Sequence, residues 1–235
     1  MEKSKLQAFI NRYFLAGNCE SVLLTTNGSN VSCNLIDMDQ TIVGKIDWKT
    51  EPFMKGELGI NHTGALMKML GAVGEDINID VKEAAGKNYA MNISEGSTKA
   101  TFMLADTSVI PAVPTINQEP DYEVSIPIDD EFVTKFIKAK NALPDAKNFA
   151  VQVQNGVIKF IINYSTVNSD NISFELKGGN NPFDPVCFSA DKLKEVLVAN
   201  KGDRGTLHVS THGLSRINFE GDDFESTYWL VMLQN

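Results

Sequence analysis

The chain has 235 residues, of which 43% are apolar and 22% are charged, and its formal net charge is −9. This length suits two domains with separate cores, and the composition is that of a globular protein. No stretch of about 18 apolar residues and no secretory signal is recognisable, so we predict no membrane partner and a cytoplasmic location. Three scattered cysteines without C-x-x-C spacing favour a reducing compartment. A uniformly acidic surface would repel nucleic acid, so the distribution of charge matters more than its sum.

The first half begins with a predicted helix and a hairpin. Apolar residues spaced three and four apart in residues 4–17 predict an amphipathic helix. Asn27-Gly28, between alternating strands, predicts a hairpin with a type I′ turn. Thr63 is the predicted N-cap of a second helix that ends near Gly74, and residues 100–104 form a closing strand.

The second half contains the same signals in the same order. Residues 129–143 predict an amphipathic helix, with Asp129 or Asp130 as its N-cap. Asn155-Gly156 predicts another type I′ hairpin, and Ser189 is the predicted N-cap of a fourth helix.

These matches indicate that the chain is a duplicated domain. The two Asn-Gly turns lie 128 residues apart, and the two caps and the closing strands 100–104 and 226–230 lie 126 apart. Back-to-back strands joined by tight turns predict antiparallel sheets, so the fold class is α+β with two helices per domain. We predict domains at 1–108 and 123–235, joined by a proline-containing linker at 109–122.

Basic residues gather in the helical windows 1–17, 61–74, 128–143 and 189–204. These windows contain eleven of the 21 basic residues and seven of the 30 acidic ones, a net +4, which leaves −13 on the remainder. A solvated outer face explains the charge of any single helix, but the joint pattern suits helices that face duplex DNA and contact its phosphates without reading sequence. The predicted DNA-facing residues are Lys5, Arg12, Lys68, Lys135, Lys138, Lys192, Lys194 and Lys201.

Catalytic and cofactor motifs are not found. The sequence has no glycine-rich nucleotide-binding motif, G-x-S-x-G or H-E-x-x-H. His208 and His212 lie in a strand-turn stretch, which disfavours a zinc site. Asp37-Met38-Asp39 fits a divalent-metal site or, better, a surface turn. We therefore predict a protein that is not an enzyme and has no catalytic residue, metal or cofactor.

Several segments resemble DNA polymerase sliding clamps, most closely those of T-even-type tailed phages, which are related to proliferating cell nuclear antigen (PCNA). The resemblance covers the whole chain and is clearest in residues 188–194, 213–221 and 228–231 and in the linker segment 109–114. It implies the DNA clamp fold and a closed homotrimeric ring around duplex DNA. It also implies loading by an ATP-driven clamp loader, tethering of the replicative DNA polymerase for processivity, and the host cell cytoplasm as location.

The resemblance also implies two sets of contact residues. Edge strands of neighbouring subunits would pair through Thr101, Phe102, Met103, Ile172, Phe174 and Leu176. Partner peptides would enter an apolar groove lined by Val109, Ile110, Val113, Leu230, Met232 and Leu233. For each of these residues, ordinary packing in the core is the alternative.

Two other functions remain open from the sequence. A virion or scaffold protein could use a doubled α+β domain for self-assembly. A metal-dependent nuclease or hydrolase would use Asp37 and Asp39.

Overall fold

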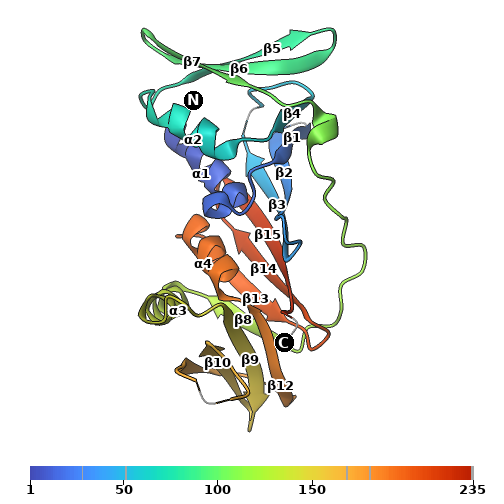
Figure 1. Cartoon of the computed structure of the whole chain (residues 1–235), viewed down its shortest axis with the longest axis vertical. Coiled ribbons are helices and arrows are strands. Elements are labelled where there is room, and N and C mark those ends of the chain that lie inside the picture. The colour runs from blue at the N-terminus through green and yellow to red at the C-terminus, as the bar shows by residue number, and fades with distance from the viewer. Residues whose placement is uncertain (28, 51, 168, 180, 234–235) are drawn as a thin grey trace. The chain divides into compact units, whose positions relative to one another are not determined.

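A computed structural model describes residues 1–27, 29–50, 52–167, 169–179 and 181–233 (Figure 1). The chain divides into two compact units. Unit 1 comprises Met1–Pro114 and the returning segment Asp222–Ser226, and unit 2 comprises Thr115–Gly221 and the residues from Thr227 onward. Both are built from antiparallel sheets and a few helices, so the predicted α+β fold of two repeated domains is confirmed.

Unit 1 has two helices and seven strands among its described residues. In chain order these are α1 (Lys3–Phe14), the short 3-10 helix η1 (Leu15–Gly17), β1 (Val22–Asn27), β2 (Asn30–Ile36), β3 (Ile42–Lys49), β4 (Glu57–Ile60), α2 (Thr63–Gly71), β5 (Asn78–Ala84), β6 (Lys87–Glu95) and β7 (Thr98–Met103), followed by η2 (Thr107–Val109). Its strands are ordered β4-β1-β2-β3 in one sheet and β5-β6-β7 in another.

Unit 2 repeats this order after one additional strand. Its elements are β8 (Val124–Ile128), α3 (Asp130–Ala142), β9 (Asn148–Gln154), β10 (Val157–Ile162), β11 (Ile172–Lys177), β12 (Phe183–Ser189), α4 (Ala190–Ala199), β13 (Arg204–Val209), β14 (Leu214–Glu220) and β15 (Phe224–Val231). One sheet has the order β11-β10-β9-β12, and β15, β14, β13 and β8 are neighbours in the other.

The duplication extends to the start of each unit. Unit 1 has no strand before its first helix, but Glu2 forms an antiparallel bridge with Asp76. This bridge takes the place of the β8–β13 pair of unit 2. Counted from the first helix, both units therefore run helix, four strands, helix and three strands.

Each unit has its own apolar core under its helices. In unit 1, α1 buries Leu6, Phe9, Ile10 and Tyr13, and the Phe9 ring lies 5.3 Å from that of Trp48 on β3. In unit 2 the rings of Phe149 and Phe160 stack at 4.8 Å and meet Phe136 of α3 edge to face. Burial of these large side chains is the main force that holds each helix on its sheet.

The helices of unit 2 are capped by neighbouring residues, as predicted. Asp129 Oδ1 accepts a hydrogen bond from the Phe132 N–H at 2.8 Å, which decides between Asp129 and Asp130. Ser189 Oγ accepts from the Lys192 N–H at 3.3 Å. Both contacts satisfy donors in the first helical turn that would otherwise lack a partner.

The helices of unit 1 are capped by distant carboxylates instead. Glu75 Oε1 accepts from the Ser4 N–H at 2.8 Å in α1, and Glu20 Oε2 accepts from the Gly64 N–H at 2.9 Å in α2. The prediction that Thr63 is the N-cap was wrong: Thr63 is the first helical residue, and its hydroxyl donates to the Glu20 carbonyl. The same helix ends at Gly71 rather than near Gly74.

One of the two predicted hairpin turns needs a correction. Asn155 and Gly156 both have positive φ, 51° and 76°, as a type I′ turn requires. In the first hairpin, however, Asn27 is still paired with Asn30 and is therefore the last residue of β1. Gly28 lies outside the described residues, and the match between the two Asn-Gly pairs is displaced by one position.

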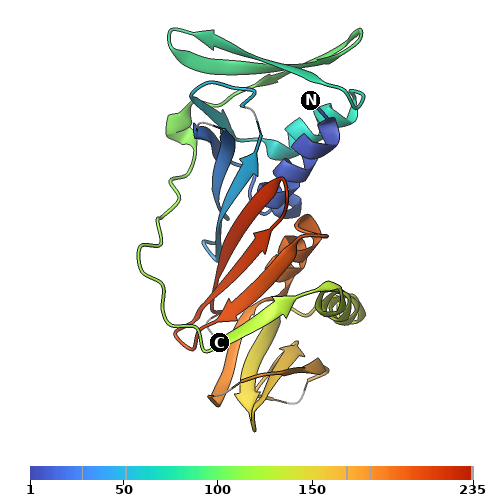
Figure 2. The same cartoon turned by 180° about the vertical axis from the view of Figure 1, so that it is seen from behind.

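The segment between the units has little regular structure. After η2, no residue from 110 to 123 belongs to a helix or strand, and the extended path can be followed in Figures 1 and 2. No helix in the described part of the chain is long and apolar enough to cross a membrane.

Candidate nucleic-acid and partner interfaces

The predicted DNA-facing lysines of unit 1 are exposed. Lys5 of α1 forms an ion pair with Asp223 at 3.1 Å, and the hydrogen bond to that carboxylate raises the pKa of Lys5. Lys68 of α2 is exposed, and no described residue forms an ion pair with it. Lys68 is therefore open to an external anion on its exposed side.

Arg12 occupies a different environment from these lysines. Its side chain is only 6% exposed, and its guanidinium lies 4.0 Å from the centre of the Phe224 ring. It also donates to the Ala8 carbonyl at 2.9 Å. We therefore correct the prediction for Arg12: the returning segment Asp222–Ser226 covers the helix flank on which this residue lies, and its cation–π contact makes it part of the core.

The helix α3 carries three lysines with distinct surroundings. Lys135 is exposed and forms an i,i+4 ion pair with Glu131 at 2.6 Å. Lys138 is exposed, and no ion pair to it exists among the described residues. Lys140 is buried, and its role is structural.

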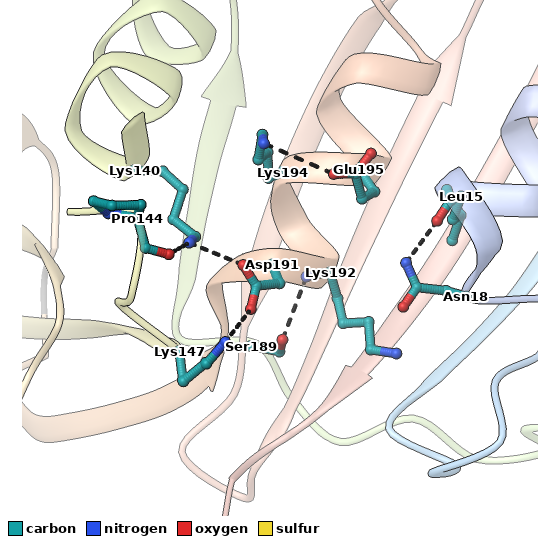
Figure 3. A network of polar contacts seen from close by, with 10 residues as sticks. All are labelled: Leu15, Asn18, Lys140, Pro144, Lys147, Ser189, Asp191, Lys192, Lys194 and Glu195. Carbon is teal, nitrogen blue, oxygen red and sulfur yellow. Dashed lines mark hydrogen bonds and ion pairs between the residues drawn. The ribbon is translucent and has the colours of Figure 1, made fainter. Parts of the chain in front are cut away.

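Lys140 links the two helices of unit 2 (Figure 3). From the last turn of α3 its ammonium donates to the Pro144 carbonyl at 2.7 Å and pairs with Asp191 of α4 at 2.9 Å. Lys147 approaches the second carboxylate oxygen of Asp191 at 3.7 Å. A buried ammonium is tolerated because a carboxylate and a carbonyl compensate for its lost hydration.

The basic residues of α4 are less buried. Lys192 and Lys194 are half-exposed, and Lys194 lies 4.0 Å from Glu195. Lys201, just after the helix, is exposed and has no ion pair among the described residues. Lys68, Lys138 and Lys201 are thus the predicted DNA-facing residues with the least internal neutralisation.

The predicted subunit-interface residues lie on two edge strands. β7 is an edge of the β5-β6-β7 sheet, and β11 is an edge of the β11-β10-β9-β12 sheet. Ile172, Phe174 and Leu176 point to the same side of β11 and are only partly buried. On β7, Thr101 and Met103 are exposed, whereas Phe102 is 4% exposed and already packed within its own unit.

The strand equivalent to β11 in unit 1 is covered by the chain itself. The N–H of Lys49 on β3 donates to the Asp223 carbonyl at 2.9 Å, and the Lys49 ammonium pairs with Glu225 at 2.7 Å. The Trp48 and Phe224 rings lie 5.8 Å apart. β11 is the equivalent strand of unit 2, and no described strand pairs with its outer edge.

Asp37 forms the base of a tight turn between β2 and β3. Its carboxylate accepts from the Thr41 N–H at 2.8 Å, the Thr41 hydroxyl at 2.9 Å and the Ile42 N–H at 3.0 Å. No three His, Cys, Asp or Glu side chains in the described part of the chain are grouped to hold a metal ion. This geometry supports a surface turn at Asp37-Met38-Asp39 over a metal site.

The Asp37 turn holds Met38 out into solvent. Met38 is 96% exposed, and it borders a hollow of about 340 Å³. The hollow is lined by the turn, by residues 17–21 and by Pro111 and Ala112 of the linker. An exposed methionine beside an extended segment suits the docking of an apolar peptide side chain.

The predicted groove residues lie in both units, and each set is described separately. In unit 1, Val109 is 63% exposed, and Ile110 and Val113 are half-buried. In unit 2, Met232 is 41% exposed and its N–H donates to the Gly213 carbonyl at 2.9 Å, and the Leu233 N–H donates to the Cys187 carbonyl at 2.9 Å. Leu230 is fully buried, so the prediction for this residue is corrected: it lies on the buried face of β15, whose other face is exposed or half-buried.

Comparison with solved structures matches this architecture over the full chain. A PCNA from A. fulgidus, bound to the C-terminal region of FEN-1, matches with a TM-score of 0.77 and 16% identity, over 100% of this chain and 97% of that chain. A PCNA from Entamoeba histolytica matches with a TM-score of 0.74 and 14% identity, over 99% and 96%. The PCNA2–PCNA3 complex from Sulfolobus tokodaii matches with a TM-score of 0.72 and 10% identity, over 99% and 97%.

The chain has the fold of the PCNA-type sliding clamps. No protein-family model and no curated protein matches its sequence. The likeness to PCNA structures therefore rests on the arrangement of two repeated units and not on residue identity.

Two features of this clamp fold were not foreseen from the sequence. Met38 was considered only as the middle residue of an acidic turn, and its 96% exposure became visible only in the structure. Glu119, in the linker, is held by residues of β14 and β15. Nothing in its local sequence distinguishes it from the other acidic residues.

Proposed function

We propose that this chain is a DNA sliding clamp that encircles duplex DNA and tethers the replicative DNA polymerase. The observation that carries the proposal is the match of both repeated units to PCNA structures over the whole length of the chain. The segments named above resemble clamps of T-even-type tailed phages, and we propose a phage-type clamp on that basis.

The edge strands support assembly into a ring. β3 is covered by Asp222–Ser226 of its own chain, and pairing of β11 with β7 of a second copy would repeat that contact between chains. Such a head-to-tail interface closes when each subunit turns the next by about 120°, which gives a homotrimer. Pairing would also cover the half-exposed Ile172, Phe174 and Leu176 and remove two open sheet edges.

Exposed lysines on the helices support DNA as the ligand. Lys68, Lys138 and Lys201 are free of internal ion pairs among the described residues, and Lys5, Lys135, Lys192 and Lys194 would contribute more weakly. Lysine side chains on separate helices, or just after one as at Lys201, offer point charges to phosphates and no bidentate reading of bases. This arrangement suits a protein that slides along any sequence.

The hollow beside Met38 supports docking of partner peptides. It is bordered by linker residues, and Val109 and Val113 lie on the same linker. The A. fulgidus PCNA is bound to the C-terminal region of FEN-1, and we propose that the replicative polymerase and an ATP-driven clamp loader use this surface here. The protein would act as a non-enzymatic tether without a cofactor.

Oligomeric state is the first test. Sedimentation equilibrium is expected to give a trimer, three chains of 25.8 kDa, and Phe174→Asp on β11 is expected to give monomers. A wild-type chain that remains monomeric at high concentration would contradict the ring. A trimer without any stimulation of a polymerase would favour the alternative, a virion or scaffold protein.

DNA contact is tested by removing charge on the helices. A triple variant with glutamine at Lys68, Lys138 and Lys201 is compared with a control variant of equal charge that carries glutamine at three exposed lysines far from the helices in sequence, Lys55, Lys82 and Lys87. The helix variant is expected to bind duplex DNA more weakly and to lower the slope of log K against log salt by about 1 for each lost phosphate contact. Equal effects of the two variants would refute the proposed DNA face.

A further inference from the structure

The linker reaches unit 2 at a cluster centred on Glu119. One carboxylate oxygen accepts from the Arg216 guanidinium at 2.5 Å and from the Tyr122 hydroxyl at 3.1 Å. The other accepts from the Trp229 indole N–H at 2.8 Å. Three donors from β14, β15 and the linker itself therefore converge on a single carboxylate.

Two of the three donors, Arg216 and Tyr122, also contact each other and a neighbouring histidine. The Arg216 guanidinium lies 5.1 Å from the centre of the Tyr122 ring, and that ring lies 5.5 Å from the ring of His208 on β13. His208 Nδ1 is 2.8 Å from the Ser125 hydroxyl on β8. Burial raises the pKa of Tyr122 to about 12, so its hydroxyl stays protonated and remains a donor.

The ion pair at the centre of the cluster is largely shielded from water. The side chains of Arg216 and Glu119 are 28% and 24% exposed, below those of the Lys49–Glu225 and Lys87–Asp106 pairs. Charge-assisted hydrogen bonds are about twice as strong as neutral ones. Three such contacts on an otherwise irregular segment are a strong local constraint.

The linker on the N-terminal side of Glu119 has no comparable anchor. The Ile110 N–H donates to the Thr107 carbonyl at the end of η2. From there to Glu119, residues 111–118 form no hydrogen bond or ion pair with any residue that the structure describes. Glu119 is therefore the first polar attachment of the linker after η2.

We propose that Glu119 is a positioning residue that fixes the C-terminal end of the linker on β14 and β15. Residues 111–118 are then the segment that adjusts when a partner peptide docks. The role in peptide docking depends on the proposed function, whereas the anchoring of the linker does not.

Anchoring is tested with a spin label at position 115. The three native cysteines are buried, so Thr115→Cys offers a single accessible thiol. Glu119→Gln removes the charge of the cluster, and Asp121→Asn removes the same charge from an exposed linker residue with no described contact. We expect faster label motion in Glu119→Gln and unchanged motion in Asp121→Asn; equal spectra for the two variants would overturn the proposal.

A double-variant comparison separates the cluster from a general loss of structure. Arg216→Gln alone is expected to increase the motion of the label as much as Glu119→Gln does. The double variant is expected to increase the label motion no further than either single variant. Additive effects would mean that the two residues do not act through one contact, which would overturn the proposal. Trp229→Phe removes only one of the three donors, so we expect a smaller increase in label motion. This variant serves as the test if either charge variant fails to fold.

Peptide docking is tested with a fluorescein-labelled peptide from the FEN-1 C-terminal region. Because a free linker must be ordered on binding, Glu119→Gln is expected to weaken binding by about two- to tenfold relative to Asp121→Asn. Faster label motion with unchanged peptide affinity would overturn the positioning role. Failure of the unaltered chain to bind the peptide would count against the proposed groove, while the label experiment would still decide the role of Glu119.

Discussion

Removal of the Asp191 carboxylate is expected to destabilise unit 2 more than removal of the lysine that it pairs with. Lys140 is 4% exposed, and its ammonium has two described partners, Asp191 at 2.9 Å and the Pro144 carbonyl at 2.7 Å. In Asp191→Ala the buried charge keeps only the neutral carbonyl. In Lys140→Met an apolar chain of similar length replaces the charge, and Asp191 remains half-exposed to water.

The structure sets the size of this difference. A buried charged group that loses its partner lowers the free energy of unfolding by about 1–3 kcal/mol. Because Asp191 is half-exposed, we expect a smaller loss than the roughly 3–5 kcal/mol of a fully buried ion pair. Asp191 is also in the first turn of α4, where its charge adds about 0.5 kcal/mol. We expect about 2–3 kcal/mol for Asp191→Ala and about 1 kcal/mol or less for Lys140→Met.

Urea unfolding followed by circular dichroism measures both variants. With an m value of about 2–3 kcal/mol/M, Asp191→Ala lowers the midpoint by about 1 M. Lys147→Met is the control, because Lys147 is 80% exposed and approaches the same carboxylate only at 3.7 Å, so its loss costs under about 0.5 kcal/mol. A Lys140→Met variant less stable than Asp191→Ala would refute the reasoning about an uncompensated buried ammonium.

Two further predictions concern other carboxylates. Asp37→Ala is expected to lose about 2 kcal/mol of stability because three donors lose their acceptor, and calorimetric titration with Mg²⁺ is expected to give no binding heat before or after the substitution. Specific Mg²⁺ binding that disappears in Asp37→Ala would instead support the nuclease hypothesis. Hydrogen bonds from Ser4 hold the pKa of Glu75 below its ordinary value of 4.5, so its stabilising contribution is complete above that value and is lost as the pH falls through the lowered folded-state pKa. The difference in unfolding midpoint between the unaltered chain and Glu75→Gln should therefore shrink in acid; a difference that is independent of pH would exclude the charge of Glu75 as its cause.

Features that depend on neighbouring residues could be predicted from the sequence. Asp129 and Ser189 cap helices that begin at the next residue, and Asn155-Gly156 forms a turn by its own backbone preference. The duplication was recognisable because these local signals recur at a nearly constant spacing. The order of the elements, and with it the fold class, followed from the same signals.

Features that depend on distant segments could not be predicted in this way. Arg12 lies on a helix flank that is polar by sequence, but Phe224 returns from the other end of the chain and covers it. Thr63 has the residue type of an N-cap, but Glu20 already occupies that role. In the candidate groove, the alternation along β15 could have identified Leu230 as a core residue, whereas the contacts of Glu119 with Arg216 and Trp229 are visible only in three dimensions.

The remote caps of unit 1 have a consequence for the order in which the chain can fold during synthesis. Ser4 and its capping carboxylate are separated by 71 residues, and Gly64 and Glu20 by 44. A ribosome that adds about 5–20 residues per second therefore releases α1 several seconds before the residue that caps it. In unit 2 the capping residue directly precedes each helix, so it is already synthesised when the helix forms. The contacts that complete unit 1 are accordingly non-local ones, of the kind that slows folding by requiring a long loop to close first.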